Sequence, residues 1–242
     1  IFPLGTCDTK GAELRYIKEL IEAAGTKTCL VDFGTSGSDA GAVDVSAAEV
    51  ASHHPNGAGA VLVGDDRGRA VTAMADAFAH FIRTRSDIGG MIGAGGSGNT
   101  VLAATGMREL PLGVPKILVS TVASGDVAPY VGPNDIAMVY SVADVAGLNR
   151  ITRAVLGNAA HALAGMMKGS VPDAAEEKPA IGLTMFGVTT DCVDQVRTHL
   201  EADYDCLVFH ATGTGGQSME KLAASGFVEG CIDATTTEVC DH

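Results

Sequence analysis

The stretch that decides the fold is IGGMIGAGGSGNTVLAATGM, residues 88–107. Its first part is apolar, its middle is rich in glycine, and its last part has the composition of a helix. A glycine-rich turn between a strand and a helix is the usual way to bring backbone N–H groups up to a phosphate. The stretch therefore predicts a strand, a turn of special function or packing, and a helix.

The same alternation of strands and helices continues in both directions along the chain. Apolar runs predict strands at 1–6, 26–35, 88–94, 116–122 and 136–141, and apolar residues at helical spacing predict helices at 9–25, 67–85 and 144–169. Strands that are apolar throughout and alternate with helices are typical of a parallel sheet covered on both faces. We therefore predict an α/β fold of the Rossmann-like, doubly wound kind. The long connection at 35–60 is a candidate lid or binding loop.

The pattern restarts after a segment rich in proline and acidic residues. We predict a first unit at 1–170, a linker at 171–179 and a second Rossmann-like unit at 180–242. The second unit alternates three predicted strands with two helices. Three such strands make a poor domain by themselves, so we expect this unit to be the first part of a longer one, truncated in this chain.

Composition and charge exclude several classes of function. The chain has 242 residues, of which 46% are hydrophobic and 19% charged, as is typical of a globular protein. Its net charge of −13 argues against a nonspecific nucleic-acid binder, which needs clustered lysine and arginine. No apolar run approaches the length of a membrane helix, about 20 residues. No signal peptide is visible, so we expect a cytoplasmic protein without nucleic-acid or membrane partners.

The cysteines indicate reduced thiols rather than disulfides or zinc. None of the six cysteines forms a C-x-x-C pair, and Cys29, Cys206 and Cys231 lie within apolar runs, where we expect them to be buried. His53 and His54 have no cysteine or histidine nearby at the spacing of metal ligands. We therefore expect no metal site made of protein side chains alone.

The glycine loop admits more than one interpretation. Gly93, Gly95 and Gly98 match G-x-G-x-x-G, but the next strand ends without an acidic residue to bind a ribose hydroxyl. A Walker A loop is excluded, because no lysine follows the glycines. Two interpretations remain open: a nest of amides that binds an anion, with side-chain donors in the loop, and a turn that only packs a helix on a strand.

Polar segments follow the other predicted strands as well. Residues 5–10, 93–100 and 120–125 are rich in serine, threonine and glycine. Because the carboxyl ends of parallel strands open onto one crevice, this density favours recognition of a polar ligand over helix caps alone. Lys10 and Arg67 are the cations expected near this crevice, although Arg67 is as well explained by a solvated helix terminus.

The strand ends of the second unit predict a separate cleft for a small anionic or polar ligand. Its expected residues are Thr189, Thr190, Cys192, Thr212, Gly213, Gly215, Gly216, Thr236 and Glu238. Cys192 belongs to the first turn of a helix, where the helix dipole lowers the pKa of a thiol. The alternative is that these threonines only cap helices and strand ends.

Several blocks of the chain resemble the tobamovirus-resistance family of ATP-binding proteins. They include DTKGAELRYI (8–17), GGSGNT (95–100), YVGPNDI (130–136), LVFHATGTGGQSME (207–220) and DATTTEV (233–239). The resemblance covers nearly the whole chain. It implies a Rossmann-like fold of two subdomains that binds ATP, with Mg²⁺ as a candidate companion, in or beside the first subdomain.

The resemblance also implies which residues bind the nucleotide. They are Asp8, Thr9, Lys10, Arg67, Gly95, Gly96, Ser97, Gly98, Asn99, Thr100, Ser120 and Thr121. Plant members of the family carry a second glycine where this chain has Asn99, and a side chain there is expected to narrow the loop. In the family the region continues beyond the DATTTEV block.

Two functions of different class follow from these observations. The first is a nucleotide-binding module that acts through conformation or partner contacts. The alternative is an enzyme that acts on a small anionic substrate in the cleft between the subdomains. Asp8, Asp66 and Asp126 are candidate carboxylates for magnesium or for a general base, but their spacing singles none of them out.

The helix predicted at 144–169 bears on assembly. It is apolar almost all round, and such a helix is normally buried. We expect it to lie at a subdomain junction and to extend into a homodimer interface, with Ile151, Val155 and Leu163 buried.

Overall fold

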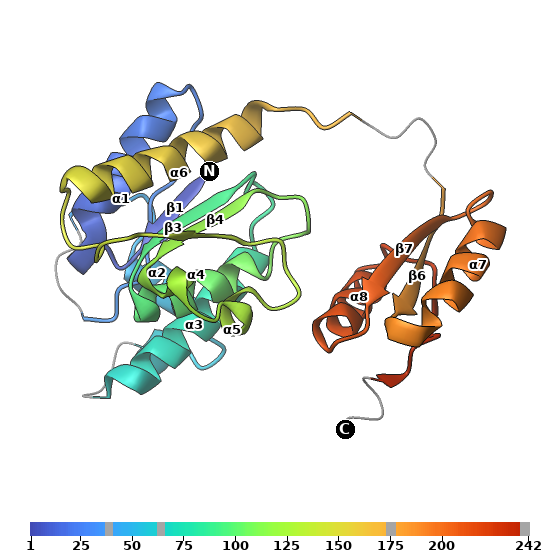
Figure 1. The fold of residues 1–242 in the computed structure, drawn as a ribbon. Helices are drawn as coiled ribbons and strands as arrows, with labels where there is room; N and C mark the ends of the chain where they lie inside the picture. The colour runs from blue at the N-terminus through green and yellow to red at the C-terminus, as the bar shows by residue number, and fades with distance from the viewer. Residues whose placement is uncertain (37–40, 62–65, 173–177, 238–242) are drawn as a thin grey trace. The chain divides into compact units, whose positions relative to one another are not determined.

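A computed structural model describes residues 1–36, 41–61, 66–172 and 178–237 (Figure 1). The chain divides into two compact units, Ile1–Val131 with Asp135–Ser170 and Gly132–Asn134 with Val171–His242. Each unit contains a parallel sheet with helices between the strands, which confirms the predicted fold class. The predicted linker at 171–179 falls mostly on residues outside the described part, and its bounds stay a prediction.

The first unit is built on a five-stranded parallel sheet. Its strands are β1 (Phe2–Gly5), β2 (Val31–Asp32), β3 (Met91–Gly95), β4 (Lys116–Ser120) and β5 (Ala137–Tyr140). Its helices are α1 (Cys7–Ala23), α2 (Ala47–Ser52), α3 (Arg67–Arg83), α4 (Ser97–Met107), α5 (Ala128–Val131) and α6 (Arg150–Lys168), with 3₁₀ turns η1 (Ala58–Ala60) and η2 (Thr121–Ser124). The strand order is β2-β1-β3-β4-β5, with every neighbouring pair parallel.

Helices cover both faces of this sheet, as Figure 1 shows. Helices α1 and α6 lie on one face, where Leu14 and Leu163 pack with Ile92 of β3. Helices α3 and α4 lie on the other face, where Phe78 and Leu102 belong to a second cluster. Because successive side chains of a strand point to opposite faces, a strand buried on both sides is apolar throughout. All residues of β1, β3 and β4 are buried, including the polar residues Lys116 and Ser120 at the two ends of β4.

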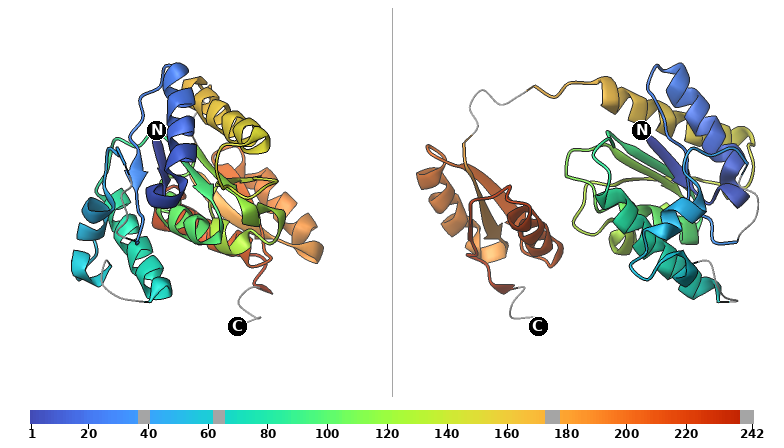
Figure 2. Two further views of the ribbon diagram at one scale, coloured as in Figure 1. Left: turned by 90° about the vertical axis from the view of Figure 1, so that its left-hand side faces the viewer. Right: turned by 180° about the vertical axis from the view of Figure 1, so that it is seen from behind.

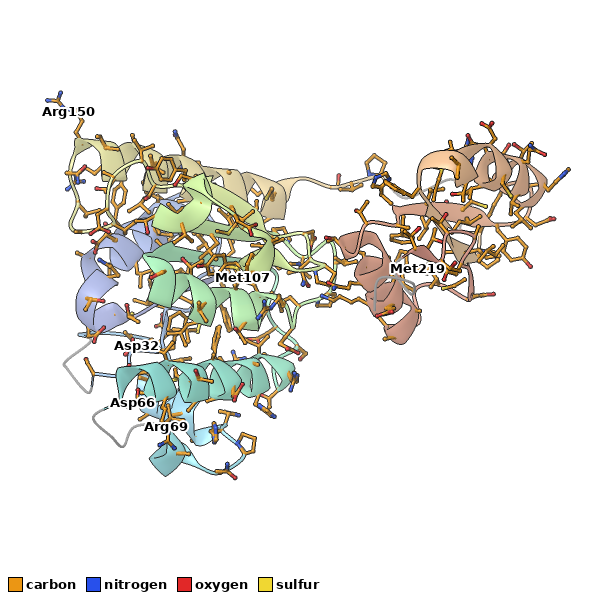
Figure 3. All side chains as sticks on the ribbon, turned by 60° about the horizontal axis from the view of Figure 1, so that its bottom comes forward. Asp32, Asp66, Arg69, Met107, Arg150 and Met219 are labelled. Atoms are coloured by element: carbon orange, nitrogen blue, oxygen red, sulfur yellow. The ribbon has the colours of Figure 1, made fainter. Side chains whose placement is uncertain are left out.

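The packing of α3 against α4 requires a glycine at one position. A β-carbon built on Gly106 of α4 would lie 2.1 Å from the ring of Phe78 in α3. Met107, the last residue of α4, is fully buried (Figure 3). The absence of a side chain at Gly106 therefore lets the last turns of α4 pack closely against α3.

The connection at 35–60 is more structured than a loop. It contains α2 and η1, and Val50 and Ala51 of α2 are buried in the core. Residues 37–40 lie outside the described part, so the predicted lid or binding loop is described only at 35–36 and 41–60. Within it, α2 is a packed element of the first unit.

The last helix of the first unit begins later than predicted and exposes more apolar surface. It starts at Arg150, because the side chain of Asn149 accepts hydrogen bonds from the first free amides, at 2.9 Å from the Ile151 nitrogen. Leu163 is fully buried and Val155 is half-buried, but Ile151 is 45% exposed, so its predicted burial within the chain was wrong. Arg150 projects from the helix start (Figure 3). The helix was predicted to be apolar on every side because it contains many alanines and glycines. These small residues do not require burial.

The homodimer stays a prediction. Two large apolar side chains of α6 are exposed, Ile151 at 45% and Met166 at 51%, and pairing of two chains along α6 would bury them. We expect light scattering at micromolar concentration to give the mass of two chains. A mass of one chain would contradict the prediction, and an Ile151→Lys variant should behave as a single chain if α6 forms the contact.

The second unit has a three-stranded parallel sheet in the order β7-β6-β8. Its elements are β6 (Ala180–Met185), η3 (Gly187–Thr189), α7 (Thr190–Leu200), β7 (Asp205–His210), α8 (Thr214–Ala224) and β8 (Gly230–Ile232). Helices α7 and α8 lie on opposite faces of this sheet (Figure 2), and Met219 of α8 is buried against it. The order is the same as that of β2-β1-β3 in the first unit. No residue of β7 is fully buried, in contrast to the central strands of the first sheet.

Candidate functional site

The strand order creates a crevice at the carboxyl ends of β1 and β3. The chain leaves β1 into α1 on one face of the sheet and leaves β3 into α4 on the other face. The connections therefore diverge between two neighbouring strands, which is where open parallel sheets of this order bind their ligands. A cavity of about 620 Å³ lies at this point. Its lining comprises Thr6, Asp8, Thr9, Lys10, Thr35, Ser36, Ala70, Val71, Gly96, Ser97, Gly98, Asn99, Leu102 and Asp144.

The first turn of α4 forms one wall of the cavity. Gly96 is the residue before the helix and supplies no side chain to cap it. The first amides of a helix have no intrahelical acceptor, and here the first ladder bond runs from the Thr100 nitrogen to the Gly96 oxygen, at 3.0 Å. Ser97 and Gly98 are exposed. The turn therefore offers N–H donors and the positive end of a helix dipole to the cavity.

Asn99 belongs to the cavity lining, but its amide group joins the ends of two strands. Its Oδ1 accepts a hydrogen bond from the Thr6 nitrogen at 3.0 Å, and its Nδ2 donates to the Ala94 oxygen at 2.9 Å. The side chain is 6% exposed. A β-carbon on Gly95 would lie 2.7 Å from that of Asn99, so Gly95 makes room for this bridge. The expected role of Asn99 as a side-chain donor to the ligand does not fit this geometry.

Thr100 and Ser120 lie beneath the cavity, within the protein. Both are fully buried, and their hydroxyl oxygens are 2.6 Å apart. The Thr100 hydroxyl also donates to the Gly96 oxygen at 2.8 Å, while Ser120 accepts from the Val122 nitrogen at 3.2 Å. These hydroxyls hold the start of α4 against the end of β4. Thr121, in contrast, is half-buried, and its Oγ1 is 3.8 Å from a β-carbon built on Gly96.

The start of α1 forms the opposite wall. The Lys10 ammonium donates to the Val145 oxygen, and the backbone of Lys10 is non-helical, with φ −124° and ψ 16°. Oδ2 of Asp8 accepts from the Ser36 hydroxyl, whereas Oδ1 is buried and has no partner among the described residues. The Thr9 hydroxyl lies 2.8 Å from that of Thr6.

Two of the three candidate carboxylates accept hydrogen bonds from backbone nitrogens at the starts of helices. Asp66 accepts from the nitrogens of Gly68 and Arg69, at 2.9 and 3.2 Å, and thereby starts α3. Asp126 accepts from the Ala128 nitrogen at 3.0 Å before α5. The third candidate, Asp8, is the one that lies in the cavity. Arg67 is the first residue of α3, but its side chain lies outside the described part.

Seven residues of the cavity lining were not among those predicted to bind the nucleotide. They are Thr6, Thr35, Ser36, Ala70, Val71, Leu102 and Asp144. Thr6 lies in the polar segment 5–10 and Thr35 and Ser36 in the connection 35–60, both of which the sequence indicated, whereas nothing in the sequence pointed to the other four. Asp32 at the end of β2 is a further missed residue (Figure 3). It accepts from the Cys7 and Gly34 nitrogens at 2.8 and 2.9 Å and so holds the β1–α1 turn.

Two features set the charge and reactivity of the site. Among the described residues of its lining, Lys10 is cationic, whereas Asp8 and Asp144 are anionic. An anion must therefore be bound largely by backbone dipoles. Cys7 is buried beside the cavity, and burial together with the Asp32 charge raises the pKa of its thiol to about 12. It remains a protonated thiol at neutral pH, which makes it a poor nucleophile.

The residues predicted for the second cleft form parts of different structures. Thr189 and Thr235 bring the ends of β6 and β8 together, with their hydroxyl oxygens 2.6 Å apart. Gly215 is a packing position, because a β-carbon there would lie 1.9 Å from the His210 oxygen. Thr190 donates to the Gly187 oxygen, Thr212 and Thr236 are exposed, Gly213 has positive φ, and Gly216 is buried. Glu238 lies outside the described residues.

A cavity in the second unit lies at the other end of its strands. It has a volume of about 680 Å³ and is lined by Lys178, Tyr204 and Glu229, among others, at the amino ends of β6, β7 and β8. None of the residues predicted for the second cleft belongs to it. The second cleft stays a prediction.

The cysteines differ in exposure, and the described residues form neither a metal site nor a membrane-spanning helix. Cys192 and Cys231 are exposed and Cys29 and Cys206 are half-buried, so the prediction that Cys231 is buried was wrong; Cys240 lies outside the described part. Within the described ranges, no three His, Cys, Asp or Glu side chains gather as metal ligands would. None of the helices in those ranges is long and apolar enough to cross a membrane.

Fold and site together define a class: an α/β protein of two parallel-sheet units, with a polar cavity at the switch point of the first. The chain belongs to the family described as uncharacterised protein family UPF0261. Its residues 1–172 match the N-terminal domain of that family, and residues 178–242 match the C-terminal domain.

Similar proteins come from bacteria and from a plant. The chain is 56% identical to a UPF0261 protein of Rhizobium meliloti over 241 residues and 46% identical to one of Clostridium tetani over 246 residues. It is 38% identical to the ToMV resistance protein Tm-1(GCR237) of Solanum lycopersicum over 266 residues. All of the chain is covered in each comparison, but only 60%, 61% and 35% of these relatives. These relatives confirm the resemblance seen in the sequence.

Proposed function

We propose that the first unit binds an adenine nucleotide in the cavity between β1 and β3, with its phosphates at the start of α4. The observation that carries the proposal is the uncapped first turn of α4, whose amides open onto the cavity at Ser97 and Gly98. Such a turn binds phosphate without a lysine, which suits a chain of net charge −13. The choice of ATP rests on the family resemblance described above.

The rest of the cavity suits the remaining parts of a nucleotide. Its volume of about 620 Å³ lies in the range of small-molecule sites. Ala70, Val71 and Leu102 give it an apolar side for the base, and the Thr6 and Thr9 hydroxyls can bind the ribose. Lys10 is the described cation that can reach the phosphates.

Asp8 is the candidate ligand for Mg²⁺. This ion is usually bound by one or two carboxylates together with the phosphates of a substrate and water. One oxygen of Asp8 is engaged by Ser36, and the other is buried without a partner in the described part. That oxygen fits a metal that arrives with the nucleotide, whereas the described residues by themselves form no group of three metal ligands.

The proposal predicts that Gly98→Val weakens ATP and ADP binding at least about tenfold, or about 1.4 kcal/mol. A β-carbon on Gly98 meets no described atom within 4 Å, and Gly98 does not have positive φ, so the fold accepts valine. The new side chain would occupy the space where the phosphates lie. Isothermal titration calorimetry with ATP, with and without Mg²⁺, measures the effect.

Gly165→Val is the matched control. Gly165 is also helical, and a β-carbon there likewise meets no described atom within 4 Å, but it lies on α6. This variant should bind ATP as the parent does. Equal affinity of Gly98→Val and the parent, or no heat of binding in the parent, would contradict the proposal.

A further inference from the structure

The segment after β5 contains a strained turn that the proposed nucleotide site does not use. Val142 has φ +64°, and the Ala143 nitrogen donates to the Ser141 oxygen at 2.7 Å. Together these define a three-residue turn with a β-branched residue in the left-handed region. Such a conformation is unfavourable for valine, and strained residues of this kind cluster at ligand sites.

Ser141 in this turn has a buried hydroxyl without a partner. The residue is 2% exposed, and its Oγ makes no hydrogen bond within the described part of the chain. Most buried polar side-chain atoms are satisfied, so an exception calls for an explanation. Ser141 lines a cavity of about 350 Å³ together with Thr121, Tyr140, Val142, Ala143 and Asp144.

The lining of this cavity indicates the chemistry of its ligand. Ser141, Thr121 and Tyr140 bear hydroxyls, each able to donate and accept, and Asp144 adds a carboxylate acceptor. No cation belongs to the described lining, so an anionic ligand would meet Asp144 uncompensated. Tyr140 is 44% exposed and can cover a ligand with its ring.

We propose that this cavity binds a small uncharged molecule with several hydroxyl groups, such as a sugar or a polyol. Its hydroxyls would satisfy Ser141 and donate to Asp144. Asp144 lines both this cavity and the larger one, and Thr121 stands beside Gly96. If the nucleotide binds as proposed above, the second ligand lies next to its phosphates, but the binding of this ligand does not depend on the nucleotide.

The test uses D-ribose, D-glucose, glycerol and myo-inositol as probes for the full chain, by saturation-transfer NMR and calorimetry. At least one probe should bind the parent protein, and Ser141→Ala should lower the affinity for that probe at least about tenfold. The melting temperature of Ser141→Ala should equal or exceed that of the parent, because the variant removes an unsatisfied hydroxyl. Ser52→Ala, which removes a hydroxyl bonded to the Glu49 oxygen in α2, should leave probe binding unchanged.

Two further measurements separate this site from the nucleotide site. The affinity of Ser141→Ala for ATP should equal that of the parent. Val142→Gly should raise the melting temperature, because glycine adopts positive φ without strain. It should also weaken binding of the probe, because the turn that holds Ser141 in place becomes less rigid. Absence of probe binding to the parent, equal binding by Ser141→Ala, or a lowered melting temperature of Ser141→Ala would each overturn the proposal.

Discussion

Replacing Asn99 with alanine is expected to destabilise the first unit by about 2–4 kcal/mol, because it leaves two buried backbone groups without partners. The Thr6 nitrogen loses its acceptor at 3.0 Å, and the Ala94 oxygen loses its donor at 2.9 Å. Thr6 directly follows β1, and Ala94 is the last residue but one of β3. Urea unfolding followed by circular dichroism measures the loss.

Asn149→Ala is the matched control for this variant. Asn149 also bonds two backbone groups, the nitrogens of Ile151 and Thr152, but it caps an exposed helix start where water can replace it. Its replacement should cost about 1 kcal/mol. A cost for Asn99→Ala no larger than this would show that Asn99 is not the bridge between β1 and β3. If Asn99 is this bridge, Asn99→Ala should lose both stability and ATP affinity, whereas Asn149→Ala should keep the ATP affinity of the parent.

Asp135→Ala is the second substitution with a large expected effect, about 3 kcal/mol of unfolding free energy, because it leaves the buried Lys116 ammonium without its counter-ion, although Asp135 itself is 40% exposed. Lys116 begins β4, and its side chain is 0% exposed. Its ammonium lies 2.8 Å from Asp135 Oδ1 and donates to the Pro111 and Val114 oxygens at 2.8 Å. Without Asp135 the buried charge keeps two carbonyl acceptors but loses its counter-ion.

The Lys18–Asp44 pair is a close control. Asp44 accepts from Lys18 at 2.5 Å and from the Leu30 nitrogen at 2.7 Å, as Asp135 accepts from Lys116 and the Gly113 nitrogen. Lys18, however, is 24% exposed. Asp44→Ala should therefore cost about 1–2 kcal/mol, from an exposed pair and one backbone bond. Equal costs for the two variants would contradict the role of lysine burial.

The pH dependence of the Asp135 contribution has a definite sign. Burial alone would raise the pKa of Asp135, but hydrogen bonds from Lys116 and the Gly113 nitrogen outweigh it and lower the pKa. A carboxyl group whose pKa is lower in the folded than in the unfolded protein stabilises the fold at pH values above its unfolded pKa, about 3.9. This stabilisation is lost as the pH falls through the lower, folded pKa. The stability gap between the parent and Asp135→Ala should therefore narrow below about pH 4.

The sequence predicted the elements of the fold better than it predicted the contacts of the site. Apolar runs located β1, β3, β4 and β6, because strands buried on both faces must be apolar throughout. The sequence does not show that β1 and β3 are neighbours in the sheet, because strand order depends on the paths of the crossover connections. That relation is what brings Asp8 and Ser97 to one cavity.

Polar residues near a strand end were assigned by position alone, and position does not say where a hydroxyl points. Thr100 and Ser120 face each other in the interior, while Thr35 and Asp144 face the cavity. Asn99 illustrates the same limit. Its type and place suggested a ligand contact, but its side-chain partners are two backbone groups. One is the Ala94 oxygen in β3, and the other is the Thr6 nitrogen, 93 positions away in the chain.

The first turn of α4 also affects how this wall of the cavity would respond to mutation. Its donors belong to the main chain, so exchanging the exposed side chain at Ser97 removes none of them. The side chains of Asn99 and Thr100 in the same turn hold it in place through their own hydrogen bonds to the backbone. The shape of this wall therefore depends on small residues in the turn and on the buried side chains that bond to it. Substitutions that add or remove a surface charge nearby would leave that shape unchanged.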